Sequence, residues 1–318
     1  MRVSVVIPVH GKAELTAHCL GTLHDELGER PDVEVIVVDD ASPDGTREAV
    51  EAAQWVRLVA HDRPAGFAAS CNEGASLAQG EYLVLLNNDT IGQGGWLDRL
   101  VEYADEHPEA GVVGAKLLYP NDTIQHAGIV VSSDLLPRHV YRGFPVDHPA
   151  VSGSRPFQAV TGACMLVRRH IFQEFRGLDE TFANGFEDVD FCLRQRSSGH
   201  DVHYCAESVL THLEAVTRGE DAEAFSRNAD LFLERWGESI RSDELATYAE
   251  DGLIRIEPGD VYPLRVTVSP ELGVIETDQL DAFKLLGLRS RQVFDLLKEN
   301  TALRFPDGAP SSTGRTVT

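Results

Sequence analysis

Hydrophobic residues gather in short, nearly unbroken runs along the first part of the chain, which predicts strands buried on both faces. Between these runs, hydrophobic residues recur at every third or fourth position, which predicts amphipathic helices. The predicted strands cover residues 3–8, 33–38, 56–60, 82–86 and 112–118, and the predicted helices cover residues 12–27, 66–79 and 96–107. This alternation predicts an α/β fold with a Rossmann-like, mostly parallel central sheet flanked by helices.

The pattern is less regular after residue 118. Short strands are predicted at 123–131 (or a hairpin there), at 160–167 with an interruption at Gly162, and at 202–205. Helices are predicted at 187–194 and 222–236, and His212 is placed in a loop. Beyond residue 240 we expect a small C-terminal extension, 241–305, with a strand at 261–268 and an amphipathic helix at 279–300. The polar tail, 306–318, is expected to be disordered.

Polar residues end two of the predicted strands. The apolar run 82–86 stops at Asn87, Asn88 and Asp89, and the run 33–38 stops at Asp39 and Asp40. These residue types also favour turns, so either stretch alone fits a plain strand end. Ligands of parallel sheets bind beyond the carboxyl ends of the strands, and carboxylates there suit divalent cations. Two such clusters at one edge of a sheet therefore favour a binding site.

Composition and charge narrow the function. The chain is 42% hydrophobic and 25% charged, as in globular proteins, with a formal net charge of −23 and a pI of about 4.8. This charge repels nucleic acids and anionic membranes, so no nucleic-acid partner is expected. An anionic substrate must then be held by a metal ion or by local hydrogen-bond donors.

The cysteines and the hydropathy indicate a cytoplasmic protein. There are five cysteines, with no C-x-x-C spacing, which favours free thiols in a reducing compartment. No signal-peptide pattern opens the sequence and no apolar run is long enough to be a transmembrane segment, so neither is expected.

Other nucleotide-binding or phosphate-binding folds fit poorly. A receiver domain would pair Asp39 and Asp40 with Asp89 and Lys116, but its acidic pair follows the first strand rather than the second. The first predicted strand is not followed by G-x-G-x-x-G, and there is no P-loop. A nucleotidyltransferase would need a basic, glycine-rich loop near the N-terminus, which is missing.

A series of short motifs runs through residues 4–219. In order they are SVVIP (4–8), VVDDAS (37–42), GFAASCNEG (66–74), LLNND (85–89), QHAG (125–128), TGAC (161–164), FEDVD (186–190) and HLEAVTRG (212–219). Together they resemble the family 2 glycosyltransferases with the GT-A fold, in particular the bacterial rhamnosyltransferase-like and cell-surface polysaccharide branch. The resemblance covers residues 1–240 and implies a nucleotide-binding half, 1–118, and an acceptor and catalytic half, 119–240.

The resemblance implies an inverting, metal-dependent enzyme. Its donor would be a nucleotide-diphosphate sugar, with UDP or dTDP as the nucleotide, and its acceptor a hydroxyl of a saccharide, a lipid-linked sugar or another molecule. The residues implied to bind substrate are Pro8, Val9, His10, Asp39, Asn72, Asn87, Asn88, Gly162, Asp190 and Arg218. Asp188 matches the catalytic base, with Glu187 beside it, and Asp89 and His212 match the metal ligands.

The sequence departs from the family at the D-x-D position, where only Asp89 is acidic. The expected cation site is therefore reduced to Asp89, His212, the donor diphosphate and water. Both Mg²⁺ and Mn²⁺ suit such ligands, and the histidine favours Mn²⁺. Asn87 and Asn88 become candidates for contacts to the ribose or phosphate. The same departure leaves a second hypothesis open, a sugar-nucleotide-binding protein whose catalysis is impaired.

Two roles suit the C-terminal extension. It could form a homo-oligomer contact, or it could dock to a partner or to the inner face of the membrane, where a lipid-linked acceptor lies. Because the net charge of −23 opposes adsorption to an anionic bilayer, we expect self-association.

Overall fold

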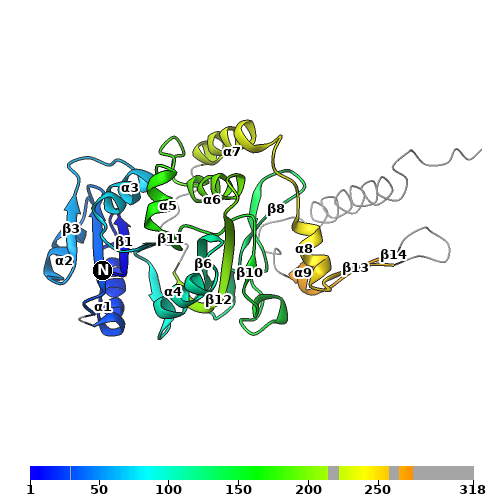
Figure 1. Cartoon of the computed structure of the whole chain (residues 1–318), viewed down its shortest axis with the longest axis horizontal. Coiled ribbons are helices and arrows are strands. Elements are labelled where there is room, and N and C mark those ends of the chain that lie inside the picture. The colour runs from blue at the N-terminus through cyan, green and yellow to red at the C-terminus, as the bar shows by residue number, and fades with distance from the viewer. Residues whose placement is uncertain (29, 214–221, 258–264, 275–318) are drawn as a thin grey trace, which may run out of the picture. The chain divides into compact units, whose positions relative to one another are not determined.

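One large sheet covered by helices on both faces forms the first unit of the protein, Met1–Ser242 (Figure 1). The structure is a computed structural model that describes residues 1–28, 30–213, 222–257 and 265–274. A second unit, Asp243–Thr318, is described by itself.

In the first unit, strands and helices alternate as predicted up to residue 118, apart from a short extra strand at 90–92. Its strands are β1 (Val3–Val9), β2 (Val33–Asp39), β3 (Arg57–Ala60), β4 (Tyr82–Leu86), β5 (Thr90–Gly92), β6 (Ala110–Leu118), β7 (Ile124–His126), β8 (Ile129–Val131), β9 (Pro137–His139), β10 (Arg155–Pro156), β11 (Cys164–Arg168) and β12 (Asp201–His212). Its helices are α1 (Ala13–Leu27), α2 (Thr46–Ala52), α3 (Phe67–Leu77), α4 (Trp96–Glu106), the 3₁₀ helix η1 (Pro149–Val151), α5 (Arg169–Glu174), α6 (Glu187–Ser197) and α7 (Ala222–Trp236).

The main path of the sheet has the order β10-β12-β6-β11-β4-β1-β2-β3. Strand β1 is parallel to β2 and β4, β2 is parallel to β3, and β12 is parallel to β6. Strand β11 is antiparallel to both of its neighbours, β4 and β6, which therefore run in the same direction. The predicted α/β fold with a mostly parallel sheet is confirmed. The hydrophobic pattern did not predict that β11 runs antiparallel to its neighbours.

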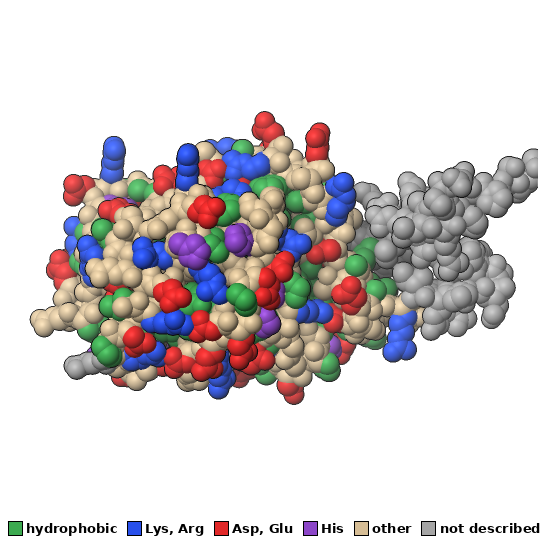
Figure 2. Space-filling model, viewed as in Figure 1, with side chains coloured by type: hydrophobic (Ala, Val, Ile, Leu, Met, Phe, Trp, Pro, Cys, Tyr) green, Lys and Arg blue, Asp and Glu red, His purple; other side chains and the backbone are tan. Residues whose placement is uncertain are grey.

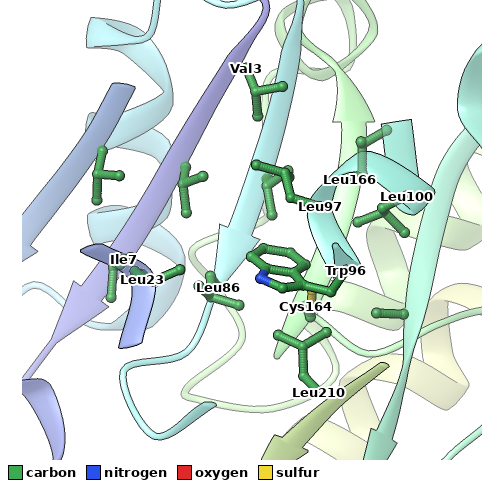
Figure 3. Packing of buried hydrophobic residues seen from close by; sticks show 14 of the residues in the cluster. Val3, Ile7, Leu23, Leu86, Trp96, Leu97, Leu100, Cys164, Leu166 and Leu210 are labelled. Carbon is green, nitrogen blue, oxygen red and sulfur yellow. The ribbon is translucent and has the colours of Figure 1, made fainter. Parts of the chain in front are cut away.

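Alternate residues of each strand face opposite layers of helices, which explains the unbroken apolar runs. On β1, Val5 and Ile7 belong to the core cluster that includes α1 and α4, whereas Val6 belongs to the cluster that includes α3 and α6. Figure 3 shows Trp96, the first residue of α4, among Leu97, Cys164 and Leu210. All five cysteines are buried free thiols.

Two predictions for the second half were wrong. The strand expected at 202–205 is part of β12, a strand of 12 residues, and His212 is its last residue rather than a loop residue. The region 123–131 is not one hairpin, since β7 pairs with β6 while β8 pairs with β9 in a separate sheet. Both differences arise from pairing with distant segments, which local periodicity does not record.

The second unit contains α8 (Glu244–Glu250), β13 (Ile254–Glu257), β14 (Arg265–Val268) and α9 (Glu271–Val274). Strands β13 and β14 form an antiparallel pair. The strand predicted at 261–268 overlaps β14, while residues 261–264, the helix predicted at 279–300 and the tail 306–318 lie outside the described residues. Within the described ranges, no helix is long and apolar enough to cross a membrane.

Candidate active site

The carboxyl ends of β1, β2, β4 and β12 and the start of β11 meet at one edge of the sheet. The backbone fixes this convergence. The amide of Asn87 donates to the carbonyl of Ala163 at 2.9 Å, and the amide of Leu213 donates to the carbonyl of Asp89 at 2.9 Å. The loop that follows β4 is thus attached to the start of β11 and to the end of β12.

Asp89 and His212 form the centre of this edge. The Nε2 atom of His212 lies 3.0 Å from Oδ1 of Asp89, and both side chains are buried. The pairing of β12 with β5, in which Thr90 opposes His212, sets their positions. Asn87 adds an amide nitrogen 3.4 Å from the same Nε2 atom.

Gln125, on β7, fixes the other side of the His212 ring. Its Oε1 atom lies 2.6 Å from Nδ1 of His212, and its Nε2 atom donates to the carbonyl of His212 at 3.3 Å. Because the amide nitrogen is committed to that carbonyl, the amide oxygen must accept from Nδ1–H. Neutral His212 therefore carries its proton on Nδ1 and turns the lone pair of Nε2 toward the carboxylate of Asp89.

This arrangement fits a divalent cation. A lone pair facing a carboxylate oxygen at 3.0 Å needs a positive charge between them or a second proton on the ring. Two ligands bound at about 2.1 Å and at right angles are roughly 3 Å apart, the separation found here. A histidine ligand also typically donates its second N–H to an oxygen acceptor, as His212 does to Gln125.

Asn88 points away from this pair. Its Nδ2 atom donates to Oγ1 of Thr16, a buried residue of α1, at 2.8 Å. This contact joins the loop after β4 to α1. A contact between Asn88 and the donor stays a prediction.

Asp188 lies at the same edge, in the first turn of α6. Its Oδ2 atom accepts from the amide of Gly162 at 2.8 Å, and its Oδ1 atom accepts from the amide of Val189 at 2.8 Å. A Cβ atom at Gly162 would lie 3.2 Å from Cβ of Asp188, so the glycine allows the close approach. Asp188 as a whole is only partly buried.

The backbone before Asp188 is bent sharply. Phe186, which precedes α6, has a φ of 76°, a left-handed conformation that is rare for an aromatic residue. Its ring packs against Phe182, Phe225 and Phe232, which hold the residue in place. Strain of this kind is often found where a functional group must be presented at a fixed angle.

The two neighbouring acidic residues are tied to protein groups. Glu187 is buried, and its Oε2 atom accepts from the amide of Gly185 at 2.5 Å. Asp190 is fully buried and accepts hydrogen bonds from Arg194, Arg235 and Trp236. These contacts give Asp190 a structural role. Its contact with the substrate stays a prediction.

The predicted nucleotide side begins at the ends of β1 and β2. Pro8 and Val9 are buried, His10 is exposed, and Nδ1 of His10 lies 2.6 Å from the carbonyl of Asp40. Asp39 is fully buried, with its oxygens accepting from the amide of Ser42 and from Nε of Arg47. Burial works to raise the pKa of Asp39, but these two donors outweigh it and hold the pKa below its usual value.

A second charged network lies beside Asp39. His61 bridges two carboxylates, with Nδ1 2.7 Å from Asp40 and Nε2 2.6 Å from Glu73. Burial works to lower the pKa of His61, but the two carboxylates outweigh it and raise the pKa above its usual value. Asp40 also accepts from the amides of Ala65 and Gly66, which fixes the start of α3.

Two further predicted residues remain, Asn72 and Arg218. The amide of Asn72 is committed to another loop, since it exchanges hydrogen bonds with the backbone of Leu178 and donates to Glu180. Its predicted contact with the donor stays a prediction. Arg218 lies outside the described residues.

No role was predicted for Gln125, Arg47 or His61. Gln125 belongs to the QHAG motif, but its role in orienting the His212 ring is evident only from the distance between the two side chains. No motif surrounds Arg47 or His61 in the sequence, and the two residues come close to Asp39 and Asp40 only in the fold, through the parallel strands.

Figure 2 shows acidic and basic side chains interspersed over the visible face, without a broad basic patch that would attract an anion.

Comparison with known proteins identifies the class. Residues 4–176 match the model of the glycosyl transferase family 2, and the chain belongs to this family. The family that the motif series predicted is thus confirmed.

Named relatives are found among bacterial proteins. The chain is 36% identical over 236 residues to the O-antigen biosynthesis protein RfbC of Myxococcus xanthus, covering 70% of this chain and 18% of that protein. It is 26% identical over 216 residues to the N-acetylglucosaminyl-diphospho-decaprenol L-rhamnosyltransferase of Mycobacterium tuberculosis (strain CDC 1551 / Oshkosh), covering 61% of this chain and 70% of that protein. The chain thus corresponds to less than a fifth of the length of RfbC.

Solved structures share the fold. A mannosyltransferase of Pyrobaculum calidifontis, PcManGT, solved with GDP-Man and Mn²⁺, gives a TM-score of 0.58 at 18% identity, over 79% of this chain and 69% of that one. GalNAc-T7, solved with UDP, GalNAc and Mn²⁺, gives 0.59 at 14% identity, over 79% and 54% of the two chains. The chain therefore has the GT-A fold.

Proposed function

We propose that the first unit transfers a sugar from a nucleotide-diphosphate sugar to an acceptor hydroxyl, with inversion at the anomeric carbon. The pairing of Asp89 with His212 at 3.0 Å, at the edge where Asp188 also lies, carries the proposal. The names of the relatives support a role in the synthesis of O-antigen or a similar cell-surface polysaccharide.

Asp89 and His212 would hold a divalent cation, with Mn²⁺ or Mg²⁺ as the ion. When bound, the cation neutralises the charge that develops on the leaving diphosphate. Gln125 keeps the Nε2 lone pair of His212 aimed at the ion by accepting from Nδ1–H. The amide nitrogen of Asn87, 3.4 Å from that Nε2 atom, is placed to donate a hydrogen bond to a phosphate oxygen.

Asp188 would act as the general base. The attacking hydroxyl must lose its proton as the new glycosidic bond forms, and the carboxylate of this partly buried residue can accept it. The amides of Gly162 and Val189 hold the carboxylate in one orientation. Such a positioned base accelerates a reaction roughly 10²- to 10⁴-fold. One displacement by an activated hydroxyl inverts the anomeric centre.

The donor would lie along the ends of β1 and β2. Pro8, Val9 and His10 provide the surface for the base, and Asp39 is proposed to contact the base or the ribose. Ser42 and Arg47 hold Asp39 in its ionised form, since both donate to its carboxylate. The family resemblance favours a uridine or thymidine nucleotide. A panel of donors is needed to identify the nucleotide.

The test is a thermal-shift and hydrolysis screen of the full chain with UDP-, dTDP- and GDP-sugars, each with Mn²⁺, Mg²⁺ or EDTA. A ligand that binds only the folded state raises its melting temperature. The proposal expects one donor class to raise the melting temperature in the presence of the cation and to be slowly hydrolysed. Binding without any transfer or hydrolysis would favour the impaired sugar-nucleotide-binding protein, and no binding of any donor would refute both functions.

A further inference from the structure

Two histidines and a glutamate lie together at the opposite edge of the sheet, away from the proposed active site. They are His107, which follows α4, Glu109, which precedes β6, and His203 near the start of β12. The backbone brings them together, since β6 and β12 are parallel and the amide of Asp201 donates to the carbonyl of Glu109 at 2.9 Å.

Their ligand atoms are close enough to share one ion. One nitrogen of each histidine and one oxygen of Glu109 all lie within 4.8 Å of one another. The Nδ1 atom of His107 is 3.0 Å from Oε1 of Glu109, and the rings of His107 and His203 have centroids 5.3 Å apart. His107 and Glu109 are partly open to solvent, so water could reach the remaining positions around an ion.

Tyr103 orients both histidines from α4. Its hydroxyl lies 2.9 Å from Nδ1 of His203, and its ring packs on His107 with a centroid distance of 4.2 Å. If Nδ1–H of His203 donates to this hydroxyl, Nε2 keeps its lone pair, the arrangement usual for a metal-bound histidine.

We propose that His107, Glu109 and His203 bind a transition-metal ion, with Zn²⁺ as the best fit. Two imidazoles and one carboxylate, completed by water, are a common ligand set for zinc. The same set selects against Mg²⁺, which prefers oxygen ligands in octahedral geometry. The site is therefore chemically distinct from the proposed Asp89–His212 site, where oxygen ligands of the donor diphosphate would dominate.

An ordinary hydrogen bond between His107 and Glu109 is the simpler explanation for that pair alone. It does not account for the position of His203, which is buried. The hydroxyl of Tyr103 contacts His203, and the ring of Tyr103 packs on His107. A bound ion would join the end of α4 to the start of β12.

The experiment is equilibrium dialysis of the full chain, without an affinity tag, against micromolar Zn²⁺, Mg²⁺ and Mn²⁺, with the bound metal measured by mass spectrometry. His107→Ala and Glu109→Gln remove one ligand each at partly exposed positions. His18→Ala, on the exposed face of α1, is the matched control for a lost surface histidine. Asp89→Ala removes the other proposed site.

The proposal expects both ligand variants to lose a Zn²⁺ ion that the wild type, His18→Ala and Asp89→Ala retain, with affinity reduced at least tenfold. Tyr103→Phe should weaken binding about tenfold while leaving the stoichiometry unchanged. Equal Zn²⁺ binding by wild type and His107→Ala would overturn the proposal. So would a Zn²⁺ ion that is lost only in Asp89→Ala. Neither result depends on transferase activity, so failure here is distinct from failure of the proposed function.

Discussion

The fully buried carboxylate of Asp190 accepts a hydrogen bond from Nη1 of Arg235 at 2.6 Å, which joins α6 to α7. Arg235 also pairs with Asp179 at 2.7 Å, and Arg194 binds the other oxygen of Asp190 at 2.8 Å. The helix that presents Asp188 is thereby anchored only two residues beyond that side chain.

Asp190→Asn keeps the shape of the side chain but removes its charge, so Arg194 and Arg235 lose their shared anion. We expect the free energy of unfolding to fall by about 1.5–3 kcal/mol, the usual value of hydrogen bonds to charged groups. Urea denaturation followed by circular dichroism measures the loss. Asp25→Asn, on the exposed side of α1, should change little. An unchanged urea midpoint for Asp190→Asn would mean that this network does not stabilise the unit.

Asp188→Asn tests the base. Transfer should fall roughly 10²- to 10⁴-fold, because asparagine cannot accept the proton of the acceptor hydroxyl. Donor affinity should remain near that of the wild type, since the proposed metal ligands and the ends of β1 and β2 are untouched. Single-turnover assays and calorimetry separate these two quantities. Turnover at the wild-type rate would remove Asp188 from the chemistry.

Gln125→Leu tests the orientation of His212. Without an acceptor for Nδ1–H, the ring can rotate or exchange tautomers, and Mn²⁺ affinity in the presence of nucleotide should fall about 10- to 100-fold. Gln125→Glu offers a carboxylate acceptor and should keep most of that affinity. Gln173→Leu, at an exposed position of α5, is the matched control. Equal Mn²⁺ affinity for Gln125→Leu and the wild type would exclude Gln125 from the metal site.

The His61 bridge predicts a pH-dependent stability. The pKa of His61 is raised in the folded protein, so its contribution is complete below the unfolded value near 6.5 and is lost as the pH rises through the folded pKa. The pKa of Asp40 is lowered, because burial, which would raise it, is outweighed by donors that include Ala65 and His61, so its contribution is lost only in acid.

The stability difference between wild type and His61→Gln should therefore be largest near pH 6 and should shrink toward pH 9. Urea midpoints measured at unit steps of pH test this trend. His18→Gln serves as the control for a histidine lost from an exposed position. A difference that grows with pH would show that His61 is neutral in the folded protein.

Much of the first half of the fold follows from the sequence. Strands buried on both faces leave unbroken apolar runs, and the residues that end them, such as Asp39 and Asp89, stand out without any alignment. The direction of β11 could not be predicted, because an apolar run is the same read either way and its neighbours β4 and β6 are distant in sequence. The twelve-residue length of β12 was missed because its pairing with β6 is irregular, with register shifts between Asp201 and Val202 and between Cys205 and Val209.

The candidate site was less accessible from sequence than the fold. Asp188, His212 and Gly162 could be named from the motif series, but the contact of Gly162 with Asp188 and the role of Gln125 are evident only from distances. The substrate contacts predicted for Asp190 and Asn72 would compete with hydrogen bonds that both side chains already make to protein groups. Residue type predicts which chemistry is possible, whereas long-range packing decides which atoms are available for it.

Strand β12 places the two proposed cation sites at its two ends. Between His203 and Thr211, β12 runs alongside only five residue steps of β6, so at about 3.3 Å per residue His203 and His212 are separated by roughly 20 Å. The Debye length at physiological ionic strength is about 8 Å, so the two sites are more than two Debye lengths apart. Ions at the two ends should therefore load and dissociate without altering each other's electrostatic affinity, and a chelator titration should resolve them as two separate steps.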